Sequence, residues 1–181
     1  MDKKITIGLI VLIATTILVS GCLTANATGT SNLDANTIQN KDYGEITTFQ
    51  KIQENVCIED GKPIVYLFST TTCPHCVWIK DTYDSTMKEY MGQGLIIAKH
   101  WELDKMDDIL TPGSDEISNA EIEIIQSLNP DGYVPMYLFG CKYFRIGNGH
   151  ERQKTTAELQ LEEKEFRAVI EQLLNDVENN K

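Results

Sequence analysis

A pair of cysteines placed directly after a short apolar segment constrains the fold more than any other feature of this chain. The segment, residues 63–69, is short and contains β-branched and aromatic residues, which favours a buried strand. Cys73-Pro74-His75-Cys76 follows it. Apolar residues then recur at helical spacing as far as Gly92. The motif is therefore predicted to lie where a central strand passes into a helix.

This position predicts different roles for the two cysteines. A sulfur at the start of a helix lies beside free backbone N–H groups, and these groups and the helix dipole stabilise a thiolate. Cys73 is thus the predicted nucleophile, and Cys76, one turn inside the helix, is the predicted resolving thiol. Pro74 suits the first helical turn because no N–H is needed there. A cationic His75 would add positive charge beside the thiolate.

Two other uses of a Cys-x-x-Cys pair are less compatible with the sequence. A structural zinc site needs four ligands. The sequence has no second motif of this kind, and His100 and His150 are too scattered to indicate a metal site. A structural disulfide gains little from closing so short a loop. The pair therefore favours redox chemistry, with neither a metal nor another cofactor expected.

The rest of the chain alternates predicted strands and helices, and its last helix has the clearest apolar face, in residues 166–177. Strands are predicted within residues 95–103, 136–139 and 143–146, and helices after the capping boxes Ser118/Glu121 and Thr155/Glu158. This order implies an α/β fold with a central mixed β-sheet flanked by helices. Residues 46–58 follow no single pattern, and a strand followed by a short helix would fit them.

The strand before the motif, the motif itself and the segment from Gly132 to Phe139 resemble the thioredoxin-like family. The resemblance covers roughly residues 46–177. It implies that Pro135, in a cis peptide bond with Val134, lies against the two sulfurs and supports the active site together with Pro74 and His75. The Pro-His dipeptide is similar to that of DsbA-like disulfide oxidases. The short span before Pro135 leaves no room for their large helical insertion, so residues 45–181 are expected to form one thioredoxin-like domain.

The resemblance implies a thiol–disulfide oxidoreductase that acts on exported proteins through Cys73 and Cys76, with a redox partner that the sequence does not identify. Leu67 occupies the position where many relatives carry a buried acidic residue. The absence of that acid disfavours rapid reductase turnover, and His75 favours an oxidising couple. The alternative function is a binding module on the same scaffold, which holds a client protein or Cu(I) through the thiolates without redox turnover.

The N-terminus predicts export. Residues 1–4 include two lysines, and residues 5–21 carry no charge and end in small residues, as in a secretory signal peptide. Val19-Ser20-Gly21-Cys22 resembles the lipobox of prokaryotic lipoproteins, which implies lipidation of Cys22 and residues 22–44 as a lipidated flexible linker. An uncleaved membrane anchor is the alternative. Either reading places the domain outside the cytoplasm and tethered to a membrane.

Charge and the remaining cysteines add three expectations. The chain carries 27 acidic against 16 basic residues, a net charge of −11, which repels phosphate backbones, so a nucleic-acid partner is not expected. Asp104, Asp107 and Asp108 are expected on a solvated face. Cys57 and Cys141 are expected at the end of the domain opposite the motif, either as a structural disulfide or as two buried thiols.

Overall fold

The computed structural model of the chain describes residues 43–111, 113 and 116–180. The predicted signal peptide (residues 1–21), Cys22 and the linker as far as residue 42 lie outside the described residues. Among the residues that are described, no helix is long and apolar enough to cross a membrane.

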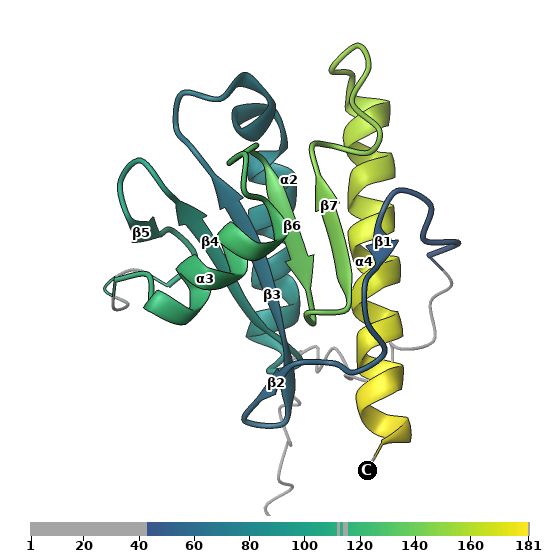
Figure 1. Ribbon diagram of the computed structural model, residues 1–181. Coiled ribbons are helices and arrows are strands. Elements are labelled where there is room, and N and C mark those ends of the chain that lie inside the picture. The colour runs from purple at the N-terminus through teal and green to yellow at the C-terminus, as the bar shows by residue number, and fades with distance from the viewer. Residues whose placement is uncertain (1–42, 112, 114–115, 181) are drawn as a thin grey trace, which may run out of the picture. The chain divides into compact units, whose positions relative to one another are not determined.

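A mixed β-sheet forms the centre of the domain (Figure 1). Its strands lie in the order β1-β7-β6-β3-β4-β5, and β2 pairs with β3. The neighbours β3 and β4 are parallel, and every other pair is antiparallel. The strands are β1 (Gln50–Lys51), β2 (Ile58–Glu59), β3 (Lys62–Ser69), β4 (Ile97–Glu102), β5 (Asp107–Asp108), β6 (Met136–Phe139) and β7 (Tyr143–Ile146).

Helices cover both faces of this sheet (Figure 1). Successive side chains of a strand point to opposite faces, so one strand contributes to the core on each side. Val65 and Leu67 of β3 belong to a core shared with α2 and α4, whereas Tyr66 and Phe68 belong to a core that packs against α3. The helices are α2 (Pro74–Gly92), α3 (Asn119–Leu128) and α4 (Thr156–Asn179). The expected mixed sheet flanked by helices is confirmed.

Most of these helices and strands lie where short-range patterns in the sequence predicted them. Both predicted capping boxes are present, with Ser118 and Glu121 at the start of α3 and Thr155 and Glu158 at the start of α4. In each, a side-chain oxygen accepts from a backbone N–H that the helix leaves unpaired. Between the motif and Pro135 the described chain holds only the rest of α2, β4, β5 and the ten-residue α3, which agrees with the absence of a large helical insertion.

Two expectations were wrong. Residues 46–58 form no helix after β1, because backbone N–H groups of this segment bond to the β6–β7 turn: that of Ile52 donates to the carbonyl of Lys142, and that of Cys57 to the carbonyl of Gly140. Asp108 does not lie on a solvated face. It is 1 % exposed, and its carboxylate accepts from the backbone N–H groups of His100 and Leu110.

A disulfide between Cys57 and Cys141 fastens the loop before β2 to the β6–β7 turn. Its two residues are 84 positions apart in the chain. Closing a loop of that length restricts the unfolded chain and stabilises the fold by about 4–5 kcal/mol in the chain-entropy model. Since β6 runs antiparallel to β3, the disulfide lies at the end of β3 remote from Cys73, as the sequence predicted.

Candidate active site

The sulfur of Cys73 caps helix α2. The residue has extended backbone angles, and its sulfur accepts from the backbone N–H of Cys76 at 3.3 Å. Pro74 takes the first helical position, where the missing N–H costs nothing. The helix start therefore directs a backbone donor at the sulfur that the sequence identified as the nucleophile.

The two thiols differ in exposure. Cys73 is half-buried, whereas Cys76 is 3 % exposed and lies inside the first turn of α2. Burial, followed by the hydrogen bond with Cys73, raises the pKa of the Cys76 thiol to about 12. Cys76 therefore keeps its proton at neutral pH while Cys73 faces the surface. This is the difference in exposure that the sequence predicted for the two thiols.

The segment before β6 contacts the sulfur of Cys73. The peptide bond between Val134 and Pro135 is cis, as expected. The Cys73 sulfur lies 3.6 Å from the carbonyl oxygen of Val134 in hydrogen-bond geometry. The structure thus brings together two predicted segments that are about 60 residues apart in the chain, the motif and the Val134–Pro135 pair.

A loop that the sequence did not mark, residues 147–154 between β7 and α4, packs on the motif. The Nδ1 atom of His75 lies 2.8 Å from each carboxylate oxygen of Glu151. The Asn148 amide donates to the carbonyl of His75 at 3.0 Å and to Glu151 at 2.7 Å, and Lys154 Nζ donates to the carbonyl of Pro74 at 3.4 Å. The loop therefore holds both residues between the cysteines.

Glu151 is ionised in this setting. Burial alone would raise the pKa of its carboxyl group, but hydrogen bonds from Asn148, His75 and Lys154 outweigh burial and hold the pKa below its ordinary value. Its side chain is only 7 % exposed. A cation at His75 is thus matched by an anion in direct contact with it, which the sequence did not indicate.

A buried tyrosine connects this loop to the sheet. Tyr137 of β6 is fully buried, and its hydroxyl donates to Asn148 Oδ1 at 2.5 Å. Burial and the charge of Glu162 raise the pKa of Tyr137 and outweigh the opposing charge of Arg145, so the phenol stays neutral. Asn148 therefore bridges the first turn of α2 and the strand beneath Cys76.

At the position where the resemblance leads one to expect a buried acid, Leu67 pairs with His100 of the neighbouring strand β4. His100 is 1 % exposed, and its two ring nitrogens lie 2.7 Å from Asp84 Oδ1 and 2.7 Å from Ser69 Oγ. A carboxylate is thus present beside His100, but it belongs to Asp84 on α2. The side chains of Ser69, Asp84 and His100 are all buried and hydrogen-bonded to one another, which gives them a structural role.

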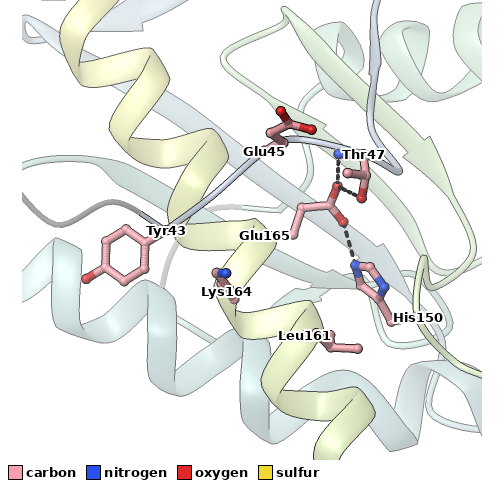
Figure 2. A pocket seen from close by; sticks show the side chains of 7 residues that line it. All are labelled: Tyr43, Glu45, Thr47, His150, Leu161, Lys164 and Glu165. Atoms are coloured by element: carbon pink, nitrogen blue, oxygen red, sulfur yellow. Dashed lines mark hydrogen bonds and ion pairs between the residues drawn. The ribbon is translucent and has the colours of Figure 1, made fainter.

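A pocket of about 320 Å³ lies between residues 43–47 and α4 (Figure 2). Its floor is Glu165, which is 3 % exposed and accepts from the backbone N–H groups of Thr47 and Thr48 and contacts His150 Nε2 at 3.0 Å. The N–H groups of Thr47 and Thr48 and the His150 ring are thus all paired with the Glu165 carboxylate. The cluster therefore fastens the segment before β1 to α4.

Comparison with known proteins adds nothing to this site: no protein-family model, no curated protein and no solved structure matches the chain. Among the residues that the structure describes, no group of three or more His, Cys, Asp or Glu side chains is placed to hold a metal ion.

Alkylation should distinguish the two thiols. At mildly acidic pH, iodoacetamide is expected to modify Cys73 well before Cys76, because Cys76 is 3 % exposed and its raised pKa keeps it protonated. Mass spectrometry of peptides from briefly treated, reduced protein measures the order. The Cys76→Ser variant is the control and should be modified once, at Cys73. Modification of Cys76 first would reverse the assigned roles.

Proposed function

We propose that the chain is a thiol–disulfide oxidoreductase of the thioredoxin-like family, with Cys73 as nucleophile and Cys76 as resolving thiol. The observation that carries the proposal is the pairing of an accessible sulfur at a helix N-terminus with a buried, protonated thiol one turn later. A backbone N–H directed at the Cys73 sulfur favours its thiolate, which is the form that attacks disulfides.

The exchange proceeds in two balanced steps. The Cys73 thiolate attacks one sulfur of a client disulfide, which forms a mixed disulfide and releases one client thiolate. Cys76 then loses its proton and attacks the Cys73 sulfur, which closes the Cys73–Cys76 disulfide and releases the second client thiolate. The client gains two electrons and the motif loses them. In the reverse direction a client dithiol is oxidised by the same two steps.

The arrangement of elements supports the family assignment. A strand leads into the motif and its helix, a parallel strand and a helix follow, and two antiparallel strands and a final helix end the domain. The Val134–Pro135 pair lies directly before the first of those two last strands and contacts Cys73. This is the order of elements that the resemblance implies.

We further propose that the domain works outside the cytoplasm, tethered by lipid at Cys22 after removal of residues 1–21. The Cys57–Cys141 disulfide supports this location, because such bonds persist in oxidising compartments and are rare in the cytosol. Its clients are accordingly exported proteins that carry thiols or disulfides.

The mature chain is expected to begin at a lipid-modified Cys22. The reason is the sequence Val19-Ser20-Gly21-Cys22 at the end of the uncharged run. Intact-mass measurement of the protein from the membrane fraction tests this, with a Cys22→Ala variant as control, which should remain unprocessed and without lipid. An N-terminus at Met1, or cleavage elsewhere, contradicts the lipoprotein assignment but leaves export standing.

His75→Gln is expected to move the potential of the couple to the reducing side by about 30 mV or more, which is a tenfold change in the equilibrium constant. The substitution removes a group that can carry positive charge and leaves the ionised Glu151 without that partner. Both changes disfavour the Cys73 thiolate. Equilibration with glutathione measures the shift. An unchanged potential, or a shift to the oxidising side, would show that His75 does not tune the couple.

Insulin turnover tests the proposed function most simply. With dithiothreitol as the reductant, catalytic amounts of the protein should accelerate reduction of the insulin disulfides well above the rate without protein. Stoichiometric retention of Cu(I) by the two thiolates, with no turnover of insulin or of a model disulfide, would favour the binding module instead.

A further inference from the structure

A pocket of about 350 Å³ lies beside the nucleophile. Its walls are His75 in the first turn of α2, the Val134–Pro135 pair, and the loop from Gly147 to Lys154. The Cys73 sulfur contacts the carbonyl of Val134, which is part of the wall. A peptide segment attached to a sulfur that reacts at Cys73 can therefore place a neighbouring side chain in this pocket.

The charge of this pocket is opposite to that of the protein as a whole. His75, Arg152 and Lys154 line it, against a single carboxylate, Glu151. That carboxylate is 7 % exposed and is already engaged by His75, Asn148 and Lys154. The chain overall carries 27 acidic and 16 basic residues. Exposed cationic groups thus stand beside the nucleophile on an otherwise acidic chain.

Arg152 is the cation of this pocket whose charge is not compensated by a carboxylate of the described residues. It is exposed, and its guanidinium has no hydrogen-bond or ion-pair partner among residues 43–111, 113 and 116–180. Lys154 shares its charge with Glu151 at 3.2 Å. Two large apolar side chains are also exposed, one just after the motif and one just before the Val134–Pro135 pair: Val77 is 59 % exposed and Tyr133 is 62 % exposed. The surface thus offers apolar contact together with one uncompensated positive charge.

We infer that Arg152, assisted by Lys154, is a specificity-determining residue that selects client segments with Asp or Glu close to the reacting cysteine. The inference rests on the proposed function and names its substrate class: an extended peptide whose carboxylate enters the pocket beside Cys73. A guanidinium binds a carboxylate through two parallel hydrogen bonds, which suits this role better than a lysine does.

Three disulfide-bridged peptides that differ only in the residues flanking the cysteine test the inference. One carries aspartates, one serines and one lysines. At physiological ionic strength, where charges beyond about 8 Å are screened, the reduced protein should react with the aspartate peptide about two- to fivefold faster than with the lysine peptide, as expected for a surface ion pair. The preference should vanish near 1 M salt, where the screening length is about 3 Å.

Arg152→Glu should abolish or invert this preference, measured as the ratio of the rates with the aspartate and the lysine peptides. Lys88→Glu is the matched control, because it changes the net charge equally from an exposed site late in α2, about four turns from the motif. It should leave the preference intact. Equal rates with all three peptides, or an equal effect of both substitutions, would overturn the inference while the proposed function stands. No reaction with the serine peptide would overturn both.

Discussion

Glu165→Ala is expected to lower the free energy of unfolding by about 3–5 kcal/mol, a large fraction of the stability of an ordinary domain. Glu165 is 3 % exposed, and its carboxylate accepts from Thr48 Oγ1 at 2.6 Å and faces Arg145 Nη1 at 3.4 Å. Removing it leaves backbone donors of Thr47 and Thr48 unpaired and the buried Arg145 with Glu162 alone as its carboxylate partner. Urea unfolding measures the loss.

Glu163→Ala on the same helix is the control, because the Glu163 side chain is 42 % exposed and its pair with Arg167 is worth about 0.3–0.5 kcal/mol. If Glu165→Ala does not fold, Glu165→Gln gives the smaller version of the same effect. A loss below about 1 kcal/mol for Glu165→Ala would show that the Arg145 cluster does not stabilise the fold.

Acid should weaken the same cluster. Burial tends to raise the pKa of Glu165, but bonds from Thr48 and Thr47 and the charge of Arg145 outweigh it, so the pKa lies below its ordinary value of 4.5. Because the folded pKa is depressed, the carboxylate contributes its full stability above that value and loses it as the pH falls through the folded pKa. Comparing Glu165→Gln with the unaltered protein across this range should show the difference shrink.

Cys73→Ser should reduce disulfide exchange to the rate seen without protein, because no other described free thiol reaches the surface. Cys76→Ser should fail differently. Cys73 can still attack, but nothing resolves the product, so a mixed disulfide with the client accumulates in stoichiometric amount. Electrophoresis under non-reducing conditions, followed by mass spectrometry of the trapped species, separates these outcomes.

Replacing Cys57 and Cys141 together by alanine is the control for both variants. Their disulfide lies at the far end of β3, so exchange should continue at temperatures where this variant is folded. Retention of exchange in Cys73→Ser, or trapping through Cys76 in that variant, would mean that Cys73 is not the nucleophile.

Much of the fold was predictable because its signals are local. The apolar run of β3, the two capping boxes and the apolar face of α4 each depend on residues close together in the chain, and each element lies where it was predicted. Residues 46–58 could not be assigned in this way. Their backbone bonds to the β6–β7 turn, a partner that is far away in sequence.

The residues of the site show the same difference between local sequence patterns and contacts made only by the tertiary fold. The motif and Pro135 carry strong local signals, whereas the loop that holds the motif carries none. Asn148 and Glu151 are ordinary polar residues, and only the tertiary fold brings them to His75. Asp108 was misassigned for a related reason: an aspartate beside other acids reads as exposed, and its burial depends on backbone donors of His100 and Leu110.

The charge around the sulfur is the most consequential feature that sequence reasoning missed. Taken alone, His75 favours an oxidising couple, but Glu151 compensates any positive charge on it at 2.8 Å. The backbone N–H of Cys76 and the helix N-terminus still favour the Cys73 thiolate. We still expect the motif to be a better oxidant than thioredoxin, with a contribution from His75 that the contact with Glu151 reduces.

The reduction potential of the Cys73–Cys76 couple tests the proposed chemistry most directly. The protein is equilibrated in glutathione buffers of defined potential, and free thiols are trapped with a mass-tagged alkylating agent. The two cysteines should interconvert together as a two-electron couple, at a potential less negative than about −270 mV, the value of thioredoxin. A couple at or below that potential would contradict an oxidising role, and failure of the two cysteines to interconvert would contradict thiol–disulfide exchange itself.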